Sequence, residues 1–244
     1  MSLKDDILAK AKEIKNATFT KKDTYSIPNI DTSSLTFGCT GLNFPATVLY
    51  IDMRGSTKVL NTHRRRVVAK IHMTYYHAIV KIAKADGGEI RSFNGDSLLV
   101  FFYGTSSEVI KRAVLSAMKM SYAINKIVNE TLTQYTDIDF GIGIDCGDVL
   151  ATKVGLGGPA DNKDLIWIGN AVNRSTKISD KCNNPFHIGI STTVYNSLDD
   201  GMKFQETSTI PWHTHQKPIW TTAWLKYNDN TEVIYKTNYW LEVS

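Results

Sequence analysis

The sequence contains no long hydrophobic run and few cysteines. No apolar stretch approaches the roughly 18 residues that a membrane-spanning helix needs, and no charged-then-apolar signal sequence opens the chain. Cys39, Cys146 and Cys182 are odd in number, far apart and without CxxC spacing, which argues against a disulfide framework and a structural zinc site. We therefore expect no membrane span and a reducing, cytoplasmic setting.

A large excess of charge of one sign is also missing. The 28 Lys and Arg residues against 24 Asp and Glu give a net charge of +4, and the basic residues are dispersed along the 244-residue chain. This distribution argues against nucleic acid as a partner and suits an anionic small molecule such as a nucleotide. With 42% hydrophobic and 21% charged residues, the composition is that of a globular protein with one sizeable core.

The chain divides into a short N-terminal segment and one main domain. Residues 4–17 place apolar side chains on one side of an amphipathic helix, and residues 18–45, which contain several Pro and Gly, are typical of an extended arm. We therefore predict an N-terminal helix and arm over residues 1–45 and a single domain over residues 46–244.

The order of elements in the main domain predicts an α+β fold. The patterns indicate a strand at 46–52, a long helix from Ser56 to Gly87, a hairpin at 90–102, a helix opened by a capping box at Thr105–Glu108, two strands joined by a turn at Gly147–Asp148, a helix after Gly169 and one or two closing strands in 220–243. This succession predicts a ferredoxin-like, mostly antiparallel sheet with flanking helices.

Two aspartates occupy positions suited to metal chemistry. Asp52 ends an apolar strand, and Asp96 follows Asn94–Gly95, a dipeptide that favours a two-residue type I′ hairpin turn. Carboxylates at neighbouring strand ends can hold two divalent cations about 3.5–4 Å apart. The spacing alone leaves open the alternative of two solvated loop aspartates.

The helix after Gly169 presents a second polar pair. Asn173 and Lys177 are one turn apart on the same face, an arrangement that can bind a sugar and a phosphate. The alternative is a surface helix with ordinary polar residues.

Four blocks together resemble the class III nucleotide cyclases in order and spacing: Leu49–Thr57, Phe93–Phe101, Gly141–Val149 and Gly169–Asn173. The resemblance covers residues 46–180 well and the tail poorly. It implies that residues 46–244 are the catalytic domain of a homodimer with two composite active sites, which converts a nucleoside triphosphate to a 3′,5′-cyclic monophosphate and pyrophosphate.

The resemblance also implies roles for individual residues. Asp52 and Asp96 match the two metal-binding aspartates, and Met53 follows where the family contributes a backbone carbonyl, so two divalent cations, Mn²⁺ or Mg²⁺, are expected. Gly55, Ser56 and Thr57 are expected to contact the substrate. Asn173 and Lys177 match the catalytic positions of the helix, although the family usually has Arg where Lys177 stands, and lysine keeps the charge without the bidentate fork. The triphosphate-binding lysine is expected to be Lys236, with Lys226 as the alternative.

The positions that read a purine base depart from the family pattern. Purine cyclases have Lys or Glu where this chain has Ser92, and Asp or Cys where it has Ile166. A purine whose polar edge stays unpaired in a buried site is disfavoured by about 1–3 kcal/mol per group. Tyr50 and Arg91 are expected to fill space that a purine needs and to offer hydrogen bonds to a smaller base. The alternatives are a core aromatic for Tyr50 and a solvated strand residue for Arg91.

These departures resemble the pyrimidine cyclases of bacterial anti-phage Pycsar systems. That resemblance implies UTP or CTP as substrate, a cyclic UMP or cyclic CMP messenger and a separate effector. We favour UTP because uridylate members are commoner in that group. The alternatives are a purine cyclase, which would be adenylate- or guanylate-forming, and a catalytically silent nucleotide-binding homologue.

Overall fold

A computed structural model describes residues 2–32, 34–156, 162–210 and 213–243. None of the helices in these residues is both long enough and apolar enough to span a bilayer. The helices are α1 (Leu3–Asn16), α2 (Ser56–Thr62), α3 (Arg65–Ala85), α4 (Ser107–Tyr122), which continues into the π-helix η1 (Ala123–Val128) and α5 (Asn129–Thr131), then α6 (Asn170–Ser179), α7 (Thr192–Asn196) and α8 (Asp200–Lys203).

The centre of the molecule is a mostly antiparallel sheet. Within the described residues its order is β10-β11-β7-β5-β2-β4-β3, with β1 beside β2 and β6 beside β5. The strands are β1 (Thr20–Asp23), β2 (Thr40–Arg54), β3 (Glu89–Asn94), β4 (Ser97–Tyr103), β5 (Asp139–Gly155), β6 (Lys163–Ile168), β7 (Ile188–Ser191), β10 (Thr221–Tyr227) and β11 (Asn230–Thr237). Only the β1–β2 and β5–β7 pairs among them are parallel. This architecture confirms the predicted fold class.

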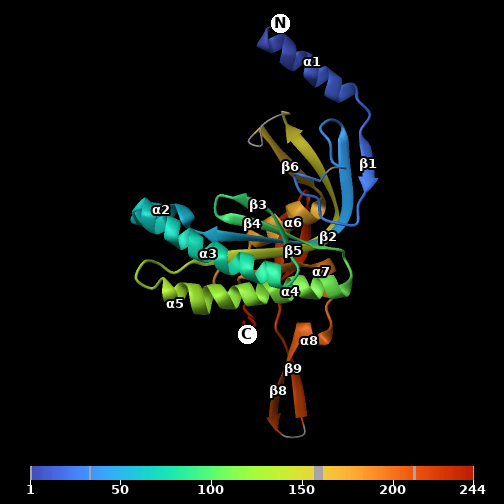
Figure 1. The fold of residues 1–244 in the computed structure, drawn as a ribbon. Helices are drawn as coiled ribbons and strands as arrows, with labels where there is room; N and C mark the ends of the chain where they lie inside the picture. The colour runs from blue at the N-terminus through green and yellow to red at the C-terminus, as the bar shows by residue number, and fades with distance from the viewer. Residues whose placement is uncertain (1, 33, 157–161, 211–212, 244) are drawn as a thin grey trace.

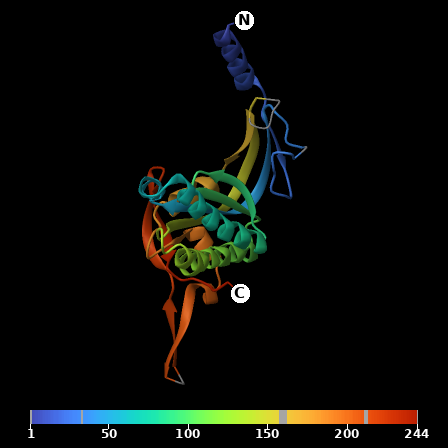
Figure 2. The same ribbon diagram turned by 60° about the vertical axis from the view of Figure 1, so that its left-hand side comes forward.

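Two segments project from this body (Figures 1 and 2). Helix α1 extends beyond one end, and the separate hairpin of β8 (Phe204–Ile210) and β9 (His213–Pro218) extends from the other. Helix α1 confirms the predicted N-terminal helix. The arm that follows contains β1, and the first residues of β2 already pair with β5, so the sheet starts earlier than the predicted strand. The domain boundary at residue 46 stays a prediction.

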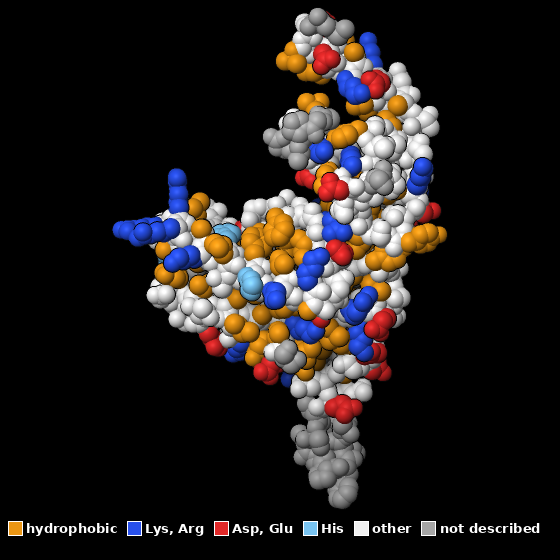
Figure 3. Space-filling model, viewed as in Figure 1, with side chains coloured by type: hydrophobic (Ala, Val, Ile, Leu, Met, Phe, Trp, Pro, Cys, Tyr) orange, Lys and Arg blue, Asp and Glu red, His pale blue; other side chains and the backbone are white. Residues whose placement is uncertain are grey.

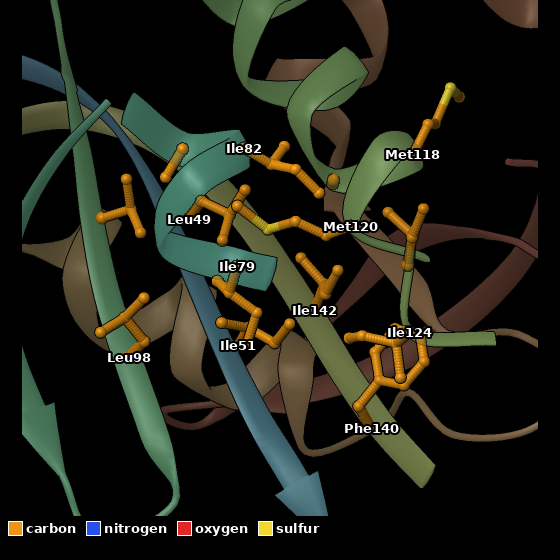
Figure 4. Packing of buried hydrophobic residues seen from close by; sticks show 14 of the residues in the cluster. Leu49, Ile51, Ile79, Ile82, Leu98, Met118, Met120, Ile124, Phe140 and Ile142 are labelled. Carbon is orange, nitrogen blue, oxygen red and sulfur yellow. The ribbon is translucent and has the colours of Figure 1, made fainter. Parts of the chain in front are cut away.

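The two faces of the sheet have different coverings. Helices α3 and α4 pack on one face, where Leu49 and Ile51 of β2 meet Ile79 of α3 (Figure 4). Since side chains alternate along a strand, Tyr50 and Asp52 point to the opposite face. Helix α6 packs on that opposite face, against β5 and β2. The alternation of β2 therefore places Tyr50 and Asp52 on the face that packs against α6, beyond the buried Phe44, Ala46 and Val48 of a second core cluster.

Three predictions about helix bounds and the β5 turn are wrong. The predicted long helix is interrupted between α2 and α3, where His63 and Arg64 have extended backbone. The predicted turn at Gly147–Asp148 is absent from the described chain there, because β5 runs continuously along β2. The N-cap of α4 is Ser106, whose hydroxyl accepts from the amide of Val109, so the box at Thr105–Glu108 does not form.

Candidate active site

Asp52 and Asp96 lie side by side at one end of β2. Asp52 pairs with Ser97 of β4 on one side and Gly141 of β5 on the other. Asp96 occupies the tight turn between β3 and β4, and the amide of Met53 donates to its backbone carbonyl over 3.4 Å. The hairpin turn is thereby attached to the strand that carries Asp52.

The turn itself lies one residue later than predicted. Asn94 pairs with Ser97, so the two loop residues are Gly95 and Asp96. Gly95 has φ +63°, a left-handed conformation that glycine adopts without strain, whereas neither Asn94 nor Asp96 has a positive φ. The predicted type I′ turn at Asn94–Gly95 is therefore wrong, but Asp96 does lie at the tip of the hairpin, as expected.

The surroundings of Asp52 favour a bound cation. Burial raises the pKa of Asp52 from 3.8 to about 6; the Arg54 guanidinium opposes this increase, and the Asp96 and Asp180 carboxylates add to it. The effects of Asp96 and Asp180 on the pKa of Asp52 show that two further carboxylates lie near it, so acidic groups gather at this end of β2. Carboxylate oxygens are the ligands that Mg²⁺ and similar hard cations prefer. The two side chains therefore fit a divalent cation, although no group of three or more His, Cys, Asp or Glu gathers at one point in the described residues.

Tyr76 supports the Asp96 turn from helix α3. Its hydroxyl lies 2.9 Å from the carbonyl of Gly95 and 3.2 Å from that of Ser97, and its ring packs against Phe93. Burial raises the pKa of Tyr76 to about 12, and the nearby Asp96 adds to the effect. Sequence reasoning missed this residue. The available signal was a pair of adjacent tyrosines, Tyr75 and Tyr76, within the predicted long helix.

Arg54 was also missed, although it lies between Asp52 and Gly55 in the first block. Its guanidinium forms an ion pair with Asp52 and hydrogen bonds with the end of α6.

The next residue, Gly55, has φ +71° and is the N-cap of α2, so Ser56 and Thr57 form the first turn of that helix. A hollow beside them is lined by Arg54, Gly55, Lys58, Val59, Thr62, Thr136, Asp137 and Asp139. Basic side chains gather at this end of the molecule, over α2 and the start of α3 (Figure 3).

Asn173 and Lys177 line one hollow, as their spacing predicts. The hollow is about 310 Å³ in volume and is also lined by Thr176, Lys226, Tyr227 and Asn228. Lys177 is exposed and lies 3.6 Å from the Asp180 carboxylate. Lys226 therefore lies beside this pair, whereas the amine of Lys236 donates to the carbonyl of Lys181 over 2.8 Å.

Arg174 is fully engaged in holding α6. It forms ion pairs with the buried carboxylate of Asp145 at 3.0 Å and with Glu232 at 2.9 Å, and it lies over the Tyr227 ring. Arg174 is therefore unavailable to replace the family arginine, whose position Lys177 occupies in this chain. Within the described residues of one chain, no hydrogen bond or ion pair joins Asn173 or Lys177 to Asp52 or Asp96.

The four predicted base-reading residues occupy different surroundings. Tyr50 is half-buried on the face that carries Asp52; burial raises its pKa, and the Asp52, Asp180 and Asp96 carboxylates raise it further. Ser92 lies on β3 and bonds to the Asn94 side chain at 3.1 Å. Ile166 is exposed on β6.

Arg91 attaches the N-terminal arm to β3. Its guanidinium donates to the carbonyls of Pro28 at 2.7 Å and Ile27 at 3.0 Å and pairs with Glu89 at 3.0 Å. The alternative of a solvated strand residue is therefore wrong, because the Arg91 side chain is only 15% exposed. A contact between Arg91 and a base stays a prediction.

The comparison with known proteins settles the family. The pattern of the Adenylate and Guanylate cyclase catalytic domain matches residues 44–226. The chain belongs to this family. It is thus a class III nucleotide cyclase, as the four sequence blocks predicted.

Individual relatives agree with this assignment. The chain is 30% identical to a protein named uridylate cyclase from Burkholderia cepacia, over 91% of this chain and 96% of that protein. It is 28% identical to a uridylate cyclase from Xanthomonas perforans, with 98% of each chain covered. The solved structure of the guanylyl cyclase Cya2 shares the fold with a TM-score of 0.64 at 22% identity, over 82% of this chain and 94% of that one.

Proposed function

We propose that this nucleotide cyclase acts on a pyrimidine, converting UTP to 3′,5′-cyclic UMP and pyrophosphate, with CTP as the alternative substrate. The observation that carries the proposal is the surroundings of the base-reading positions. Ser92 and Ile166 bear no charge with which to pair the polar edge of a purine, and the large side chain of Tyr50 lies on the same strand face as Asp52. The relatives named uridylate cyclase support the same substrate class.

The reaction would begin at the aspartates. Asp52, Asp96 and the carbonyl of Met53 would hold two divalent cations, Mn²⁺ or Mg²⁺, which when bound acidify the ribose 3′-hydroxyl and neutralise the triphosphate. The 3′-oxygen would lose its proton to solvent water and form a bond to the α-phosphorus, while the bond from that phosphorus to the oxygen bridging to the β-phosphate would break. Pyrophosphate carries away the bonding electrons.

The residues of α6 would stabilise this displacement. Asn173 would orient the ribose, and the Lys177 ammonium would lie beside the charge that develops on the α-phosphate. Lys226 lines the same hollow, which favours it over Lys236 as the triphosphate ligand. Gly55, Ser56 and Thr57 would contact the phosphates at the start of α2.

The lack of a direct bond between the two residue groups supports a homodimer. Among the described residues of one chain, no hydrogen bond or ion pair joins the aspartates to Asn173 or Lys177, so a second copy would complete each site by supplying α6 to the partner's aspartates. We propose in addition that the cyclic pyrimidine is an anti-phage messenger read by a separate effector, which rests on the resemblance to the Pycsar cyclases.

The test is incubation of the purified protein with ATP, GTP, CTP and UTP separately, in Mn²⁺ and in Mg²⁺, with products identified by mass spectrometry. We expect cyclic UMP from UTP, and none from Asp52→Ala or Asp96→Ala. Cyclic AMP or cyclic GMP would favour the purine alternative. No cyclic product from any nucleotide would favour a catalytically silent homologue.

A further inference from the structure

The side chain of Arg54 joins strand β2, which carries Asp52, to helix α6, which carries Asn173 and Lys177. One terminal nitrogen donates to Oδ2 of Asp52, and the other donates to the carbonyl and hydroxyl of Ser179, the hydroxyl at 3.1 Å. Its Nε donates to the carbonyl of Cys182 over 3.2 Å. All three guanidinium nitrogens are thus used, and the side chain is only 22% exposed.

The space for this guanidinium is created by a glycine. Gly141 pairs with Asp52 across β5 and β2. A Cβ atom at Gly141 would lie 2.5 Å from the Cys182 carbonyl oxygen and 2.6 Å from that of Ser179, and it would also collide with the guanidinium of Arg54. Because these approaches are closer than van der Waals contact allows, only glycine at this position admits both Arg54 and the end of α6.

The end of α6 is a favourable place for a cation. The last carbonyls of a helix have no partner within the helix, and they form the negative end of its dipole. Arg54 adds a second donor to the carbonyl of Ser179, the last residue of α6, which also accepts from the amide of Cys182 at 2.8 Å. It donates as well to the carbonyl of Cys182, three residues beyond the helix, and directs its remaining nitrogen to Asp52. An arginine has the planar fork for this double task, whereas a lysine is a single point charge.

We propose that Arg54 is a positioning residue that orients the Asp52 carboxylate for metal binding and fixes it to helix α6. The proposal rests on the metal-binding role of Asp52 in the proposed function. By holding Oδ2, Arg54 restricts rotation of the carboxylate and leaves Oδ1 available to the cation. Partners that orient a metal-binding carboxylate typically change metal affinity or activity 10–100-fold when they are removed.

Arg174 provides a matched control. It also anchors α6 through two carboxylates, Asp145 and Glu232, but it does not contact Asp52. Replacing either arginine by lysine keeps the positive charge and removes the fork. If Arg54 merely stabilises the end of a helix, Arg54→Lys and Arg174→Lys should behave alike.

The experiment measures Mn²⁺ binding without nucleotide, from the electron paramagnetic resonance signal of free Mn²⁺, for the wild type and both lysine variants. We expect Arg54→Lys to weaken Mn²⁺ binding about 10-fold and to lower kcat more than it raises KM. Arg174→Lys should leave Mn²⁺ binding within about 2-fold of wild type. Equal effects of the two variants, or unchanged or tighter Mn²⁺ binding by Arg54→Lys, would overturn the proposal.

Two controls keep the outcome interpretable. Thermal melts establish that each variant folds. If Arg54→Lys does not fold, Ser179→Ala takes its place, because it removes one acceptor of Arg54 and is expected to weaken Mn²⁺ binding about 2–3-fold. Unchanged Mn²⁺ binding by Ser179→Ala would overturn the proposal. Asp52→Ala must abolish the measured Mn²⁺ binding. If it does not, the metal assignment in the proposed function fails; if it does and Arg54→Lys binds normally, only the role of Arg54 fails.

Discussion

The hydroxyl of Tyr76 donates to the carbonyl of Gly95 at 2.9 Å and so joins helix α3 to the turn that presents Asp96. We expect Tyr76→Phe to lower kcat about 10-fold, because a carboxylate that shifts by a fraction of an ångström no longer has the productive geometry. The free energy of unfolding should fall by only about 0.5–1.5 kcal/mol, since one hydrogen bond is lost.

The adjacent Tyr75 is the matched control for Tyr76→Phe. Its hydroxyl is buried and has no hydrogen-bond partner among the described residues. Tyr75→Phe should therefore preserve kcat and leave the free energy of unfolding unchanged or increased. Steady-state kinetics and urea melts of both variants make the comparison. Similar kinetics for the two variants would contradict a role for Tyr76 at the turn.

Asp52 should make the metal-free protein less stable as the pH rises. Burial raises the pKa of Asp52 from 3.8 to about 6, so the folded state binds the proton more tightly than the unfolded state. The contribution of Asp52 to the free energy of unfolding is therefore fully present below about pH 4 and is lost as the pH rises through about 6. Asp52→Asn avoids the cost of the buried charge.

Melts in EDTA between pH 4 and pH 8 measure this effect. Above pH 6, Asp52→Asn should exceed the wild type by about 1–2 kcal/mol, because water that still contacts the side chain screens part of the penalty. Near pH 4 the two proteins should be equally stable. A constant difference across the whole range would show that the Asp52 charge is not its cause.

The two lysine candidates for the triphosphate are separable by kinetics. Lys226 lines the hollow that contains Asn173 and Lys177, whereas Lys236 is bonded to the carbonyl of Lys181. We expect Lys226→Ala to raise the KM for UTP about 10-fold by removing one charge-assisted contact to phosphate. Lys236→Ala should change KM less than 2-fold. The opposite ranking would restore Lys236 as the ligand.

The predictable part of this molecule is the part set by local pattern. The apolar run at 46–52 located the second half of β2, and the spacing of Asn173 and Lys177 placed both side chains in one hollow. The residues missed were those whose partners are distant in sequence. Arg54 contacts residues more than a hundred positions away, and Tyr76 reaches a turn from another element. Neither contact leaves a periodic signal, because only the tertiary fold brings the partners together.

The turn predicted within β5 is wrong because partners distant in sequence decide the course of this strand. Gly147–Asp148 is a local turn signal, yet β5 continues through it because every residue from Leu42 to Arg54 of β2 finds a partner on β5. A long ladder of backbone hydrogen bonds thus outweighs the preference of one dipeptide. The contacts of Arg91 were also not predictable from local pattern, because its partners lie in the N-terminal arm, whose path the sequence does not specify.

Tyr50 is the residue on which the choice of base most directly depends. It lies two positions before Asp52 on the same face of β2, so its side chain stands beside the proposed metal site. If its ring excludes purines, Tyr50→Ala should lower the ratio of UTP to ATP turnover about 10-fold, while Tyr50→Phe, which keeps the ring and loses the hydroxyl, should retain exclusion of ATP. If the hydroxyl instead binds the pyrimidine, both variants should raise the KM for UTP, and ATP should remain a poor substrate. Competition assays with equal UTP and ATP, read by mass spectrometry, separate the two cases. Unchanged selectivity in both variants would remove Tyr50 from base recognition and leave positions 92 and 166 to explain it.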